Sequence, residues 1–199
     1  MKYLLLTSVI LFGCTFAHAQ NINYKVVDTN LKTFYNNLSV ISEPAEEEDY
    51  YGQDAHYSGF QSSYTNNNDG TISDNVTGLM WQQNMGVKIS FDDAFIKADS
   101  LTVGGHHDWR VPTLKELYSL IQFNGITGQS SSNSNPYIDT DYFDQPFGDE
   151  SLGERFIDAQ TWSATEYIGK IMHGNDGIFG VNFIDGRIKG YPKAKPATG

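Results

Sequence analysis

Carboxylates gather in the stretch of residues 139–150, which is the part of this sequence best suited to chemistry. They are Asp139, Asp141, Asp144, Asp149 and Glu150. Calcium takes about six to eight oxygen ligands from irregular loops, so a calcium ion is the cofactor that this stretch could hold, and an acidic surface loop without metal is the alternative. A glycosidase pair would require a defined separation between two carboxylates, which a sequence does not provide.

Other reactive side chains are scattered along the chain. The histidines are His18, His56, His106, His107 and His173, and no pair among them has the one-turn helical spacing of a zinc motif. A nucleophile elbow, a Walker loop and a dinucleotide fingerprint are all missing from the sequence. We therefore expect a protein without a catalytic site, and a metal-dependent hydrolase that uses the acidic loop is the alternative.

Two tyrosines flank the carboxylates of the same loop. Tyr137 and Tyr142 alternate with acidic residues, and tyrosine rings can stack on the faces of sugars when they are exposed. The formal net charge of −11 and the pI near 4.7 argue against nucleic acid or an anionic lipid surface as the partner. Cationic ligands, metal ions and neutral glycans remain as candidate ligands, and the sequence does not predict an oligomeric state.

The N-terminal segment has the pattern of a secretory signal. Lys2 is followed by an apolar run over residues 3–12, and a small-x-small cleavage site ends at Ala19. Cleavage there would remove Cys14, the only cysteine, and would exclude disulfides. A lipoprotein-type site at Cys14 is the alternative, which the bulky Phe12 disfavours. We expect an exported protein that is periplasmic, secreted or on the cell surface, with no spanning helix.

The elements that position these residues are organised around residues 106–121. Thr113 and Glu116 have capping-box spacing, so a helix should begin after Thr113, and it is expected to end near residues 123–125. Pro112 precedes the cap and keeps the chain before it extended. Arg110 alternates with Trp109 in this extended part, and we expect it to pair with Asp108, Glu116 or Asp185.

Local signals predict the neighbouring elements. Ser90 should cap a first helix of residues 91–101 that Gly104-Gly105 ends. Asp69-Gly70 and Asp185-Gly186 predict tight hairpins, and strands are expected at residues 24–28, 78–83, 157–163, 178–184 and 187–191. Residues 20–49 are expected to form an extended arm and a solvated, mobile acidic linker, and residues 126–135 a surface loop.

Four segments in order resemble the Lcl C-terminal domain family, a family of bacterial extracellular domains of unknown function. They cover residues 69–81, 108–117, 162–165 and 183–187, and they contain all three tryptophans. The motif residues are Trp81, Trp109, Arg110, Pro112, Thr113, Glu116, Trp162, Asp185, Gly186 and Arg187. Together with the signal pattern and the composition of residues 20–49, the resemblance divides the chain into a signal peptide (1–19), an arm and linker (20–49) and the domain (50–199).

This resemblance implies an α+β, C-type-lectin-like fold, in which two helices flank short twisted antiparallel strands and long irregular loops carry any binding surface. Members of the family usually have leucine at the position of Val111 and serine at that of Ala164, and they close with a further strand. That strand is missing before Gly199, so we expect a domain truncated at its C-terminus and an incomplete copy of a longer protein.

The favoured function is an exported, non-catalytic binding or adhesion module that presents its loops to a glycan or a surface protein. A purely structural envelope domain is the remaining alternative.

Overall fold

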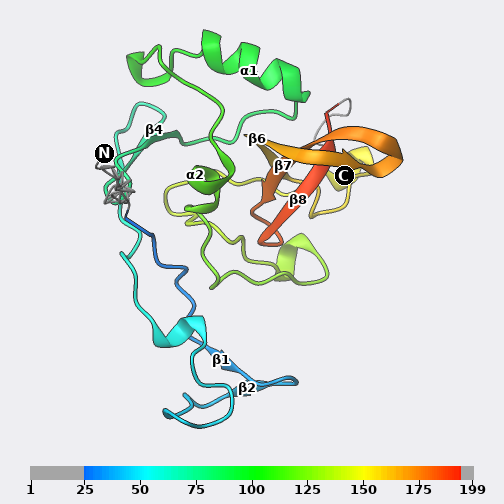
Figure 1. The fold of residues 1–199 in the computed structure, drawn as a ribbon. Coiled ribbons are helices and arrows are strands. Elements are labelled where there is room, and N and C mark those ends of the chain that lie inside the picture. The colour runs from blue at the N-terminus through cyan, green and yellow to red at the C-terminus, as the bar shows by residue number, and fades with distance from the viewer. Residues whose placement is uncertain (1–24, 194–199) are drawn as a thin grey trace, which may run out of the picture.

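A computed structural model describes residues 25–193, so the expected signal segment lies outside the described residues. The strands form three small antiparallel sheets (Figure 1). The strands are β1 (Phe34–Tyr35), β2 (Val40–Ile41), β3 (Tyr64–Asn66), β4 (Thr71–Asp74), β5 (Met80–Gln82), β6 (Gln160–Ile171), β7 (Asn175–Asn182) and β8 (Arg187–Pro192). The sheet orders are β1-β2, β3-β4-β5 and β6-β7-β8.

The helices are few and short. They are the α-helices α1 (Phe91–Ser100) and α2 (Leu114–Tyr118) and the 3-10 turns η1 (Asp54–His56), η2 (Val103–Gly105), η3 (Ser131–Asn133), η4 (Glu150–Leu152) and η5 (Met172–Gly174). Among residues 25–193, no helix has the length and apolar character needed to cross a membrane. The fold is therefore a mixed α and β structure that depends on small sheets and long loops.

Both predicted helix starts are confirmed. The Ser90 hydroxyl accepts a hydrogen bond from the Asp93 N–H at the start of α1. At α2, Thr113 and Glu116 form a complete capping box, in which each side chain accepts from the other residue's backbone N–H. These caps satisfy N–H groups that have no partner inside the helix, so the local sequence determines where each helix begins.

The predicted end of α2 near residues 123–125 is wrong, because the helix already ends at Tyr118. The Leu120 and Ile121 N–H groups bond to carbonyls three residues back, and the Gln122 N–H then donates to the Tyr137 carbonyl. Leu120 and Ile121 are adjacent in sequence and both buried. Both would also share the Leu117 face of a continuing helix, so what changes after Tyr118 is the backbone hydrogen bonding and not the burial of these side chains.

The hairpins at the two Asp-Gly turns are confirmed, with β3 and β4 on either side of the first and β7 and β8 on either side of the second. The expected strand at residues 24–28 is reduced to one bridge between Val27 and Phe60. The strand predicted at residues 157–163 starts later and runs much further, to Ile171. Register shifts after Trp162 and Tyr167 break its alternating pattern.

The main core lies where α2 packs against β7 and the β3-β4-β5 sheet. Its fully buried side chains come from distant parts of the chain, and they include Ile72, Leu120, Phe143, Val181 and Phe183. A second, smaller cluster joins Phe91 of α1 to Trp162 and Ile178 of the C-terminal sheet. In consequence α1 is attached to the domain chiefly at its first turn (Figure 1).

An arm extends away from the rest of the domain (Figure 1), and it takes in residues 50–58, which were expected in the domain, as well as most of the arm and linker expected at residues 20–49. It covers residues 29–58 and carries β1, β2 and η1. Its base is held by the Asp28 N–H, which donates to the Phe60 carbonyl over 2.8 Å, and by the Phe123 N–H, which donates to the Thr29 carbonyl over 2.7 Å. The acidic segment forms a defined turn, in which the Glu48 carboxylate accepts from the Ala45 N–H.

Candidate functional site

A cavity of about 620 Å³ lies between α1 and the domain core. Its walls come from α1, β5, residues 84–89, residues 106–112, residues 145–147 and the beginning of β6. Six of the ten family-motif residues line it, namely Trp81, Trp109, Arg110, Pro112, Glu116 and Trp162. Protein interiors usually contain few voids larger than a water molecule, so a cavity of this size is the feature of the domain most suited to a ligand.

Helix α1 forms one wall because its inward face is small. Ala94, Ala98 and Leu101 recur at helical spacing and line the cavity, whereas Ile96 on another face is 69% exposed. The first turn is held down by Phe91, whose ring lies edge-on to Trp162 with centroids 5.7 Å apart. Alanine side chains leave space beneath the helix that larger side chains would fill.

The three tryptophans differ in their hydrogen bonding. The Trp162 Nε1–H donates to the Ile89 carbonyl over 3.1 Å, and the Trp109 Nε1–H donates to the Val103 carbonyl over 3.2 Å. These bonds attach the segments on both sides of α1 to the cavity wall. The buried Trp81 Nε1–H has no partner within residues 25–193, and it is closed off from solvent.

Two acceptors in the wall also lack partners within the described residues. They are the buried Oε1 atoms of Gln145 and Gln160. A buried polar group without a partner costs about 1–3 kcal/mol. These atoms are closed off from solvent, so a ligand would reach them only if the cavity wall shifted, and the Gln160 side chain already lies against the Tyr191 hydroxyl.

The motif pair Arg110 and Glu116 has a structural arrangement. The Glu116 carboxylate accepts from Arg110 Nη1 and Nη2 over 2.8 and 2.6 Å, and from the N–H and hydroxyl of Thr113 over 2.8 and 2.9 Å. The bond from Arg110, with help from Thr113, lowers the pKa of Glu116 to about 2. A carboxylate that stays ionised and fully bonded is a poor general acid at neutral pH. Of the three predicted partners of Arg110, the structure therefore selects Glu116.

The predicted calcium ligands do not come together. Asp139 and Asp149 each accept from the backbone N–H two residues further on, at Asp141 and Ser151. Asp144 and Glu150 are exposed. Within residues 25–193 no three His, Cys, Asp or Glu side chains are grouped so that they could hold a metal ion. The histidines are likewise apart, with His106 at the cavity, His56 in the arm and His173 in η5.

Tyr137 and Tyr142, the predicted sugar-stacking residues, are both partly buried against the main core. A Cβ atom at Gly186 would lie 2.9 Å from the Tyr137 ring, so the ring covers the β7-β8 turn. In that turn Asp185 is buried and its carboxylate lies 2.6 Å from Lys189 Nζ and 3.8 Å from Arg187 Nη1. This group of predicted residues supports the fold.

The chain belongs to the Lcl C-terminal domain family, whose sequence model matches residues 70–198. The match covers the cavity residues and all four motif segments. No curated protein and no solved structure matches the chain.

Sequence reasoning missed Gln145, Gln160 and the inward face of α1. The alanine spacing of α1 was visible in the sequence, and it could have indicated a helix that packs loosely. The two glutamines carry no such signal, because only the folded chain shows that their oxygens are buried.

Proposed function

We propose that this domain is an exported, non-catalytic binding module whose ligand occupies the cavity beneath α1. The observation that carries the proposal is a cavity of about 620 Å³ walled by three tryptophans. Volumes of about 300–1,000 Å³ and mostly apolar walls with a few polar groups are typical of small-ligand sites. The stable Arg110–Glu116 pair favours binding over catalysis at this place.

The ligand class that we propose is a neutral glycan. Three tryptophans line the cavity, and aromatic walls suit the apolar faces of sugar rings. The net charge of −11 disfavours polyanionic glycans. Export is supported by Lys2, the apolar residues 3–12 and the small-x-small site, and a C-type-lectin-like arrangement by the two short helices, small antiparallel sheets and long loops.

The test is a glycan array followed by tryptophan fluorescence titration with the best ligand. Ala98→Phe places a ring in the cavity, so we expect it to weaken binding at least tenfold. Ile96→Phe is the matched control, because it adds a ring to an exposed face of the same helix and should bind like the wild type.

Two results would contradict the proposal. One is an array without any binding. The other is a glycan that binds Ala98→Phe as tightly as it binds the wild type, since that ligand would lie outside the cavity.

A further inference from the structure

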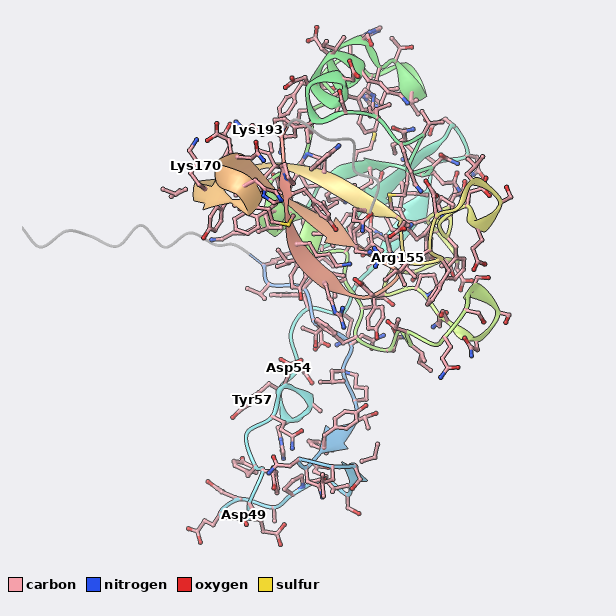
Figure 2. All side chains as sticks on the ribbon, turned by 90° about the vertical axis from the view of Figure 1, so that its right-hand side faces the viewer. Asp49, Asp54, Tyr57, Arg155, Lys170 and Lys193 are labelled. Carbon is pink, nitrogen blue, oxygen red and sulfur yellow. The ribbon has the colours of Figure 1, made fainter. Side chains whose placement is uncertain are left out.

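The arm carries a second pocket that shares no residue with the cavity. It is lined by the acidic turn of residues 43–46 and by Tyr51, His56 and Tyr57. Figure 2 shows Asp54 and Tyr57 at η1, part-way along the arm, and Asp49 towards its far end. Tyr57 is 62% exposed, so the pocket opens to solvent on a part of the chain that projects from the domain.

His56 holds the two walls of this pocket together. Its Nε2 atom lies 3.0 Å from the Pro44 carbonyl, and because a carbonyl can only accept, Nε2 carries the proton. The rings of Phe34 and Tyr51 pack edge-on against the imidazole, with centroids 4.5 and 4.6 Å away. The Nδ1 atom is buried and has no hydrogen-bond partner within residues 25–193, so the imidazole joins the walls and does not present a nitrogen to solvent.

The pocket is lined by negative charge and contains no positive charge. Within the described residues Glu43 and Glu46 make no ion pair and no side-chain hydrogen bond, whereas Glu48 of the same run caps its own turn. Residues 29–58 hold six carboxylates and a single basic side chain, Lys32. Lys32 lies 3.6 Å from Asp28 at the base of the arm. Nothing in the lining neutralises the two glutamates.

We propose that this pocket binds an alkylammonium group. A cation is attracted to the faces of aromatic rings, and quaternary ammonium and methyl-lysine ligands are commonly held by such rings. Glu43 and Glu46 line the pocket and add Coulomb attraction. A bare metal ion fits less well, because two carboxylates cannot replace the roughly six oxygen ligands of its hydration shell.

The experiment is an NMR titration of the full chain with n-butylammonium and with n-butanol, its neutral counterpart of equal length. We expect saturable shifts at residues 43–57 with the ammonium ion in the millimolar range and at least tenfold weaker effects with butanol. Glu43→Gln with Glu46→Gln should weaken ammonium binding about tenfold. Glu47→Gln is the matched control, since it removes a charge from the same run without lining the pocket.

The aromatic contribution is tested separately. Tyr57→Leu should weaken binding severalfold, and Tyr35→Leu should not, because Tyr35 is similarly exposed but lies outside the pocket. Equal shifts with butanol, the absence of saturable shifts, or equal losses in Glu47→Gln and in the double variant would overturn the proposal.

The source of the ammonium group is distinguished by a further titration. Tighter binding of a short lysine peptide than of n-butylammonium would assign the pocket to a lysine side chain of a protein partner. Equal or weaker binding of the peptide would assign it to a free amine.

Discussion

Glu116 links the family-motif arginine to the start of α2, and we predict that Glu116→Gln destabilises the domain in a pH-dependent way. The carboxylate accepts two bonds from Arg110, both of 2.8 Å or less, and two from Thr113. A glutamine keeps one carbonyl oxygen for the Thr113 N–H, so the cap largely survives. The variant chiefly loses the charged, bidentate contact to Arg110.

The expected loss of stability in Glu116→Gln follows from the pKa of Glu116. Lowering the pKa of Glu116 from 4.5 to about 2 would correspond to at most about 3.4 kcal/mol of stability at neutral pH. The Arg110 side chain is 57% exposed, so solvent screening reduces this value, and we expect a loss of about 1–2 kcal/mol. For a domain of this size, that corresponds to a midpoint lowered by about 2–8 °C.

The pH dependence gives the sharper test. Because the folded-state pKa of Glu116 is lowered, its contribution is complete above about pH 5 and declines as the pH falls from about 4.5 towards 2. The difference in unfolding free energy between wild type and Glu116→Gln should therefore be largest at pH 7 and close to zero near pH 2. Urea unfolding followed by tryptophan fluorescence measures it at each pH.

A matched control is Glu166→Gln, which removes the partner of Lys193 in a contact of 2.7 Å. The Glu166 side chain is 64% exposed, so this change should cost less than about 0.5 kcal/mol. A wild-type-to-Glu116→Gln difference that stays constant from pH 7 to pH 2.5, or that equals the control, would refute the reasoning.

Three further changes test the core and the β7-β8 turn by urea unfolding. Gly186→Ala should cost about 1–3 kcal/mol, because φ is 69° and the new Cβ would approach the Tyr137 ring to 2.9 Å, whereas Gly153→Ala, with φ of 81° and open space, should cost less. Asn182→Ala should cost about 2 kcal/mol or more, because its buried side chain donates one hydrogen bond and accepts two, and a smaller loss would mean that water replaces it. Phe143→Ala should cost about 3–5 kcal/mol, and a loss below about 1 kcal/mol would show that the core collapses around the gap.

The features that could be predicted from the sequence are local ones. The caps at Ser90 and Thr113 and the hairpin at Asp185-Gly186 each depend on a few consecutive residues, and the structure contains all three. The sequence predicts three candidate carboxylate partners for Arg110. The observed partner, Glu116, lies six residues away along the chain. Short-range hydrogen bonding and turn chemistry determine these features.

The features that could not be predicted depend on distant parts of the chain. Tyr137 is partly buried because Gly125 and Gly186, both without a Cβ atom, leave room for its ring. The sequence alone gives no sign that these glycines meet the same tyrosine. Likewise, β6 continues beyond its expected end because β7 pairs with it through two register shifts, which hide the alternating pattern.

The cavity and the arm suggest different ligand chemistry within one acidic chain. Around the cavity, the charged motif residues Arg110 and Glu116 neutralise each other, whereas the lining residues Lys97 and Asp108 make no ion pair within the described residues. In the arm pocket, Glu43 and Glu46 face solvent without a cation. Raising the salt concentration should therefore weaken cation binding in the arm pocket and leave binding of a neutral ligand in the cavity nearly unchanged, because salt screens contacts between exposed charges. A neutral ligand of the cavity and a cation of the arm can then be bound by one molecule without competing.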